Sequence, residues 1–371
     1  MSSYVPLHDD FMEPEELEML REEIALNAKL DHLDILCDAV RTIQDPSTSQ
    51  VAKSIAIEHA STYIGEQALG YLYDLEKERD TGLTLVGKIF RLVAKLLQTI
   101  AEGFFRYMAK LLSMTAKRER ASARLITQIN KNIHKYRDQK PKIKLTQTMI
   151  PLTNDGKLLN GHSISKLIDG QISKINPDVM MSKMGAIING IPADIESGKD
   201  YETIRKDITG ISETVHAVLK GAYGAQESII KNVRTSTVRI PGVNISLVVR
   251  TKPGRISEAK LETQKIKIKS KTMADGLSPQ EAFSAISTAN QAFNRLLDRD
   301  DGYRFKKDTN DLIRMIKASS PNDAKKDLVR YIPRWVSFIR QYIKTTNDLE
   351  YRVALAVLAT VEASKKEWSI S

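Results

Sequence analysis

Cysteine is almost absent from this sequence: Cys37 is the only one among 371 residues. A lone cysteine cannot close an intramolecular disulfide, which excludes a disulfide-stapled secreted scaffold and a cysteine-based zinc module. Cys37 lies beside Leu33 and Leu36 on an apolar helical face, a setting that predicts a buried thiol rather than a nucleophile. Aromatic residues are scarce at 6%, and with only 18 glycines and 12 prolines the chain is neither collagen-like nor proline-rich.

Long apolar runs are also missing. Between Lys88 and Lys117, in the most apolar region, the longest uncharged run is six residues. A transmembrane helix needs roughly 18 apolar residues in succession, so we expect no membrane span. The acidic N-terminus has no basic segment followed by an apolar one, which argues against a secretory signal. We therefore expect a soluble protein that is made without export.

The sequence contains none of the common catalytic motifs. It has no GxxxxGK[ST], HExxH or GxSxG pattern, and no GxGxxG that opens a helix after a strand. The segment 298–302 is similar to a calcium loop, but its glycine comes early and the final glutamate is missing, which predicts a helix-ending turn. The histidines are scattered without metal-ligand spacing: His8, His32, His59, His134, His162 and His216. We expect no enzyme activity, no metal and no cofactor.

The charges are strongly segregated along the chain. Residues 1–50 hold twelve acidic and three basic residues, although the whole chain has a net charge of +10. The segment from Lys88 to Lys144 contains fifteen lysines and arginines but only three acidic residues. Such an excess attracts polyanions, nucleic acid first and anionic lipid second, although a basic run is often only a solvated face.

The periodicity of apolar residues predicts a mainly α fold, with elongated amphipathic helices and a small antiparallel β-sheet in the middle third. Proline and turn residues mark boundaries that divide the chain into four regions. We expect an acidic N-terminal helical segment (1–46), a basic amphipathic helical region (47–141), a mixed α+β region with the small sheet (142–275) and a C-terminal helical region (276–371).

Several local elements are predicted within these regions. Residues 142–152 favour a short edge strand, and 199–231 favour one or two helices. Strands are expected at 235–240 and 243–250, joined by a type II turn at Pro241–Gly242, and at 265–269, where lysines occupy one face. Ser278, Pro279 and Glu281 form a helix-start pattern.

A narrow polar stripe marks the helix predicted over residues 82–117. Its members follow steps of three, four or seven, and nearly all other positions are apolar. Three interpretations are open: a bundle helix covered by the terminal helices, a helix in a membrane interface, or a partner-protein interface. The stripe consists of Lys88, Arg91, Lys95, Glu102, Arg106, Lys110 and Lys117.

The segment that follows is less apolar and more basic, and it is the better candidate for phosphate contacts. The lysine face of the predicted strand at 265–269 is a second candidate. The candidate nucleic-acid-binding residues are Lys117, Arg118, Arg120, Arg124, Lys131, Lys135, Arg137, Lys140, Lys142, Lys144, Lys265, Lys267 and Lys269.

The layout as a whole resembles a known family. An acidic Glu/Leu-rich helix (EELEMLREEIALNAKL) precedes an apolar-basic stretch (GKIFRLVAKLLQTIAEGFFRYMAKLL) and a basic helix (AKRERASARLITQINK), before a mixed segment and a final helix. This order resembles the internal head proteins of large contractile-tailed bacteriophages. The resemblance implies a location inside the capsid with the packaged genome, and some members of that family are ejected with the DNA.

The same resemblance implies trimming by a prohead protease that cuts after glutamate. Glu58, Glu213 and Glu258 stand in fitting three-residue contexts, and we expect Ile256–Glu258 to lie in an accessible loop. The leading hypothesis is thus a structural, non-enzymatic virion protein whose partners are packaged double-stranded DNA and capsid or other internal head proteins. The alternatives are a membrane-active or pore-forming protein that uses residues 83–112 on the host membrane, and a capsid scaffold or shell-binding protein.

Overall fold

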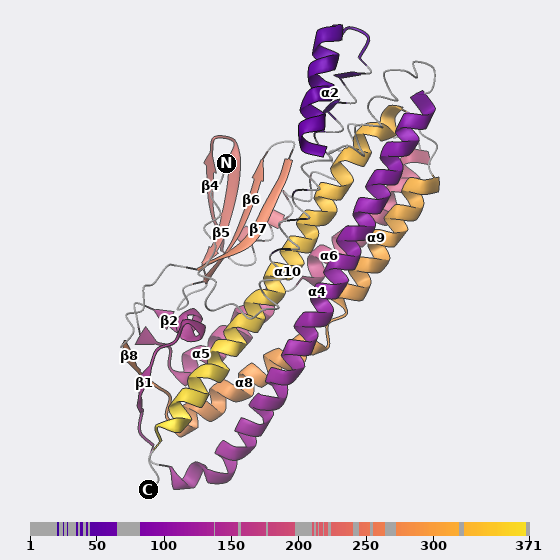
Figure 1. The fold of residues 1–371 in the computed structure, drawn as a ribbon. Coiled ribbons are helices and arrows are strands. Elements are labelled where there is room, and N and C mark those ends of the chain that lie inside the picture. Colours follow the sequence, from indigo (N-terminus) through magenta and orange to yellow (C-terminus); the bar gives the residue numbers. More distant parts are fainter. Residues whose placement is uncertain are drawn as a thin grey trace. The chain divides into compact units, whose positions relative to one another are not determined.

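A computed structural model gives the fold of this chain (Figure 1). It forms two compact units, each assembled from three segments of the chain. The first unit comprises Met1–Tyr107, Gly185–Ile208 and Phe305–Ser337, and the second comprises Met108–Met184, Thr209–Arg304 and Phe338–Ser371. The structure describes residues 45–64, 82–136, 138–154, 157–175, 177–196, 224–239, 245–252, 255–263, 272–318 and 323–368, with scattered positions at 21–43 and 210–221.

Helices account for most of the described residues, which confirms the mainly α class. The longest, α4 and α10, have 51 and 44 residues. The helices are α2 (Gln50–Ile64), α4 (Gly82–Asn132), α5 (Gly161–Gly170), α6 (Asp178–Glu196), α8 (Pro279–Leu297), α9 (Asp301–Ala318) and α10 (Asp323–Lys366), with 3₁₀ turns η2 (Ile133–Lys135), η3 (Gln147–Leu152) and η4 (Ile172–Lys174).

The strands form small antiparallel sheets, as the sequence predicted. One sheet has four strands in the order β4–β5–β6–β7, and the pairs β1–β8 and β2–β3 stand apart from it. The strands are β1 (Lys142–Lys144), β2 (Thr153–Asn154), β3 (Lys157–Leu158), β4 (Gln226–Ile230), β5 (Val233–Arg239), β6 (Ile245–Lys252), β7 (Arg255–Thr263) and β8 (Met273–Asp275).

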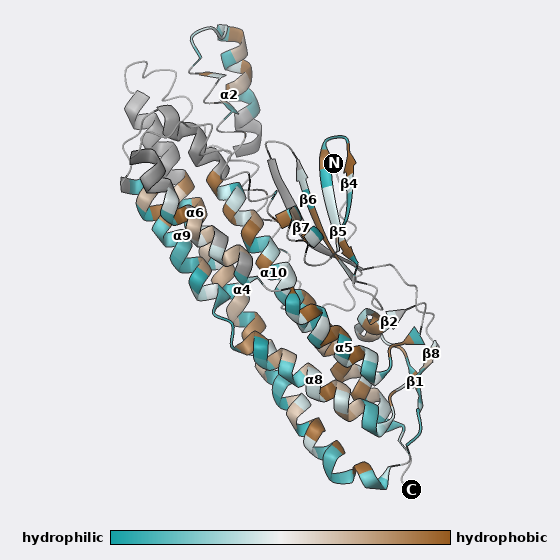
Figure 2. Ribbon diagram, turned by 180° about the vertical axis from the view of Figure 1, so that it is seen from behind, coloured by the Kyte–Doolittle hydropathy of each residue, from teal (hydrophilic) through white to brown (hydrophobic). Residues whose placement is uncertain are grey.

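The core of the first unit is built on the apolar face of α4. Val93, Leu97 and Ile100 are fully buried, and the ring of Phe104 lies 4.7 Å from that of Phe305 in α9. In Figure 2 hydrophilic and hydrophobic segments alternate along α4, as expected of an amphipathic helix. The described part of this face is therefore buried within the chain, as the bundle-helix interpretation expected, and α9 of the C-terminal region covers it at Phe104.

In the second unit α5 packs against α8, and a glycine sets their distance of approach. A Cβ on Gly161 would lie 2.6 Å from the backbone oxygen of Glu281, so only glycine fits. Ser278 caps α8 in the expected capping box with Glu281. At the chain end the indole Nε1 of Trp368 donates to the backbone oxygen of Leu277 at 3.0 Å.

The four-stranded sheet departs from the sequence-based expectations in two places. Residues 226–230 were expected to be helical but form strand β4. A turn at Lys231–Asn232 connects β4 to β5. The prediction of a loop at Ile256–Glu258 is wrong, because Ile256 pairs with Thr251 and Glu258 pairs with Arg250 in the β6–β7 ladder. The predicted turn at Pro241–Gly242 and the predicted strand at 265–269 lie outside the described residues.

Candidate polyanion-binding surface

The second half of α4 presents a row of exposed cations. Lys117, Arg120, Arg124 and Lys131 are all exposed, and they follow one another at steps of three, four and seven residues. With 3.6 residues per turn these steps return to the same side of the helix, and 14 residues span about 21 Å. Lys135, in the 3₁₀ turn that follows, is exposed as well. We call Lys117, Arg120, Arg124 and Lys131 the α4 basic row.

No carboxylate interrupts this row, because the only acidic residue between positions 103 and 137 points elsewhere. Glu119 is half-buried and faces α8, where the Asn290 amide donates to its Oε1 at 3.3 Å and to the Ser122 hydroxyl at 2.8 Å. Arg118 is half-buried too and stands off the row. The α4 basic row therefore carries four positive charges without internal neutralisation.

A cation from the far end of the sequence joins this surface. The ammonium of Lys365 in α10 donates to the Oε1 of Gln128, which is exposed on α4 between Arg124 and Lys131. Sequence reasoning missed Lys365, because the residues lie 237 positions apart and only tertiary packing brings them together. Glu362 is also exposed on the last turns of α10 and places a negative charge there. This surface is therefore more basic on α4 than on α10.

The other candidate cations form ion pairs or lie outside the α4 basic row. Lys140 pairs with Glu281 at 2.8 Å, and Lys142 pairs with Asp275 at 2.6 Å, across the β1–β8 pair. The ammonium of Lys142 lowers the pKa of the Asp275 carboxyl. Lys144 is exposed at the end of β1. The remaining candidates, Arg137, Lys265, Lys267 and Lys269, lie outside the described residues.

The first half of α4, in the other unit, is less uniform in charge. Lys95 and Arg106 are exposed, but so is Glu102, which accepts a hydrogen bond from Gln98 at 2.9 Å. This half therefore offers alternating charges, whereas the basic row of the second unit is uninterrupted.

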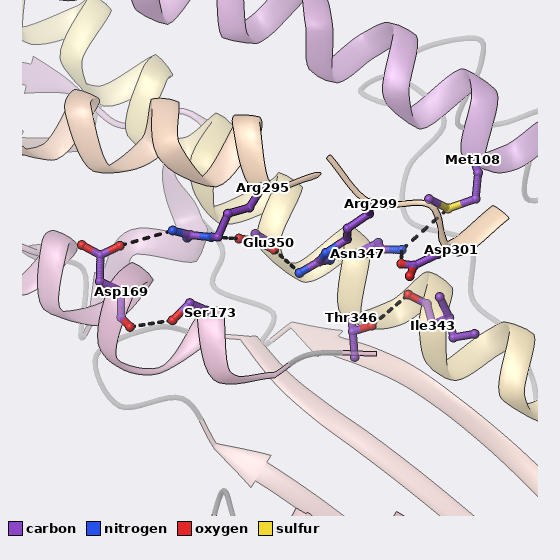
Figure 3. Close-up of polar contacts among 10 residues, drawn as sticks. All are labelled: Met108, Asp169, Ser173, Arg295, Arg299, Asp301, Ile343, Thr346, Asn347 and Glu350. Atoms are coloured by element: carbon purple, nitrogen blue, oxygen red, sulfur yellow. Dashed lines mark hydrogen bonds and ion pairs between the residues drawn. The ribbon is translucent and has the colours of Figure 1, made fainter. Parts of the chain in front are cut away.

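A buried polar network occupies the corner between α8 and α9 (Figure 3). Glu350, which is 2% exposed, accepts from Arg295 Nε at 2.9 Å and from Arg299 Nη2 at 2.6 Å. Arg299 also donates to the Oδ1 of Asn347, and the Asn347 amide donates to Asp301 at 3.1 Å. Burial raises the pKa of the Asp301 carboxyl despite that hydrogen bond. Residues 298–300 thus form the expected turn that ends α8, whereas Asp301 and Gly302 already belong to α9. The ion pairs with Glu350 hold this turn against α10.

A second buried polar cluster joins a helical segment to the four-stranded sheet. His216 is fully buried, with Nδ1 at 2.6 Å from the Ser236 hydroxyl and Nε2 at 2.8 Å from the Thr251 hydroxyl. Burial and the nearby Arg234 lower the pKa of this histidine. Ser236 is itself fully buried within β5, so the arrangement fastens the two layers and exposes no nucleophile.

The candidate cleavage sites fall on ordered secondary structure. Glu58 is exposed on α2, and Glu213 is exposed on a helical position and pairs with Arg234. Glu258 lies in the paired strand β7. A protease needs an extended and accessible backbone. Glu58 and Glu213 lie in helical backbone, whereas Glu258 lies in the extended backbone of β7, the last strand in the order β4–β5–β6–β7.

Within the described ranges, no group of three or more histidine, cysteine or acidic side chains is placed to hold a metal ion. None of the helices seen there is long and apolar enough to cross a membrane. Comparisons with protein-family models, curated proteins and solved structures find no match for this chain.

Proposed function

We propose that this chain is a non-enzymatic structural protein that binds double-stranded DNA without sequence preference. The observation that carries the proposal is the α4 basic row, four exposed cations on one side of a helix with no carboxylate among them. Phosphates repeat along both strands of a duplex, so a straight line of cations contacts the backbone without reading bases. Ordered helical packing beneath the row holds the charges in place and supplies no reactive group.

The location in this proposal is the interior of a bacteriophage capsid, together with the packaged genome. Its support is the resemblance in layout between this chain and internal head proteins, to which the basic row adds a matching chemistry. Capsid or other internal head proteins are the second class of partner in this proposal. Cleavage near Glu58 would remove most of the acidic segment and leave a more basic body. In the capsid-scaffold alternative the acidic N-terminal segment would be the docking element.

The membrane-active alternative is less favoured by the structure. It requires the apolar face of residues 83–112 to be available, and that face is buried at Val93, Leu97, Phe104 and Leu111. An interfacial helix must expose the face that it inserts. The α4 helix would have to leave its packing before it could act in this way.

Two measurements test the proposal. Purified protein should bind unrelated duplexes of equal length with equal affinity, and the affinity should fall steeply with salt. Quantitative mass spectrometry of phage particles, with labelled N-termini, should find the chain in full heads. Depletion from heads that have released their DNA would indicate ejection, and absence from particles would contradict the capsid location while leaving DNA binding to be judged by the first measurement.

A further inference from the structure

The β4–β5 hairpin ends in two exposed isoleucines. Ile229 is 73% exposed and Ile230 is 68% exposed, immediately before the turn. Lys231 and Asn232 form that turn with positive φ values of 50° and 63°, the backbone of a tight type I′ connection. Because successive strand residues point to opposite faces, one isoleucine projects from each side of the hairpin end.

The β6–β7 hairpin turns at the same end of the sheet. Ile230 pairs with Val233, and Lys252 pairs with Arg255, so both pairs stand in the last row of the ladders. The row before it contains Ile229, Arg234, Thr251 and Ile256. We call these two rows and the Lys231–Asn232 turn the sheet end.

The sheet end combines apolar side chains with positive charge. Its two rows and the described turn hold no acidic residue, and the cations there are Lys231, Arg234, Lys252 and Arg255. Arg234 forms ion pairs with Glu213 and Glu227, and Lys231 is exposed in the turn. Lys252 and Arg255 add two basic positions to the sequence of the last row. Figure 2 shows the hydrophobic residues of β4 next to the hydrophilic turn.

We propose that the sheet end docks on an anionic lipid bilayer. Exposed isoleucines gain free energy by entering the boundary between headgroups and acyl chains, and adjacent cations are attracted to anionic headgroups. A nucleic-acid backbone would satisfy the cations but would leave two isoleucines in water. This docking site is separate from the α4 basic row and requires no membrane span, because only the hairpin end enters the interface.

The test is co-sedimentation of the full chain with vesicles of phosphatidylcholine alone or mixed with phosphatidylserine. Binding should be strong only to the mixed vesicles, and the Ile229→Thr/Ile230→Thr variant should bind about tenfold more weakly, because threonine keeps the branched shape but loses apolar area. The matched control is Val51→Thr/Ile55→Thr on α2, at positions 70% and 59% exposed. It should bind as the unmodified chain does, and equal melting temperatures should show that each variant is folded.

Several results would overturn this assignment. One is no binding of the unmodified chain to phosphatidylserine vesicles. Another is binding that survives in the isoleucine variant but disappears when Lys117, Arg120 and Arg124 are replaced by glutamine, since α4 charge alone would then explain it. A loss of DNA affinity or of self-association in the isoleucine variant, with vesicle binding unchanged, would equally contradict a lipid partner.

Discussion

The carboxylate of Glu350, only 2% exposed, accepts a hydrogen bond from Arg299 Nη2 at 2.6 Å. Arg299 lies in the turn between α8 and α9, whereas Glu350 lies 51 residues further on in α10. The same carboxylate accepts from Arg295 in the last turn of α8, so one side chain fastens the helix end and the turn to a third helix. This ion pair is structural, because every charged group in it faces another protein group.

Removal of that carboxylate should destabilise the fold. We expect Glu350→Ala to lower the free energy of unfolding by about 3 kcal/mol, because it leaves two partly buried guanidinium groups without their shared partner. Denaturant unfolding followed by circular dichroism measures the change. Arg314→Ala, which breaks an exposed pair with Asp311 in α9, is the matched control and should cost less than about 1 kcal/mol. Equal costs for the two variants would contradict the structural role of the network.

The buried His216 should make stability depend on pH. Its folded-state pKa lies below the ordinary 6.5, chiefly because burial disfavours the imidazolium, with Arg234 acting in the same direction. The unfolded chain therefore takes up a proton first, so stability is complete above pH 6.5 and falls as the pH decreases below it. Glu213 and Glu227 oppose this shift but do not reverse it.

Thermal unfolding between neutral and mildly acidic pH checks this sign. The His216→Gln variant, whose amide can still hydrogen-bond to Ser236 and Thr251, should lose less stability on acidification than the unmodified chain does. The exposed His162 provides the control, since His162→Gln should leave the pH profile unchanged. Identical profiles for both variants would show that His216 does not titrate in the expected direction.

The close approach of α5 and α8 gives a paired prediction on glycine. Gly161→Ala should destabilise the chain by about 2 kcal/mol, because its Cβ would collide with the backbone of Glu281. Gly103→Ala in α4 meets no atom within 4 Å and should stabilise the chain by about 0.5–1 kcal/mol through helix propensity. Unfolding midpoints of the two variants should therefore move in opposite directions, and a common direction would refute this packing.

Local patterns in the sequence were sufficient for much of the fold. The start of α4 at Gly82 and the capping box at Ser278 depend on neighbours within one or two helical turns, and both were predicted correctly. The apolar face of α4 predicted its burial for the same reason. Strand β4 was missed because QESII lacks a clear alternation, and its pairing with β5 decides its conformation.

The candidate site was predictable only in part. The basic character of the segment after residue 116 identified Lys117, Arg120 and Arg124 as candidates, and the structure shows them exposed on one side of α4. Spacing could not reveal that Lys140 and Lys142 are engaged with Glu281 and Asp275, since those partners lie more than 130 positions away. The clusters around Glu350 and His216 likewise join distant segments and leave no local signal.

The proposed function depends most on DNA binding by the α4 basic row through phosphates. The most direct test is the salt dependence of binding to a DNA duplex, measured by fluorescence anisotropy, for the unmodified chain and for Lys117→Gln/Arg120→Gln/Arg124→Gln. Each lost phosphate contact removes about 0.9 from the slope of log K against log salt, so the triple variant should have a slope shallower by about 2.7. The control, Lys140→Gln/Lys142→Gln, replaces lysines already paired with carboxylates and should keep the original slope. Equal slopes for the unmodified chain and the triple variant, or no affinity for DNA at low salt, would show that the α4 basic row does not bind DNA phosphates.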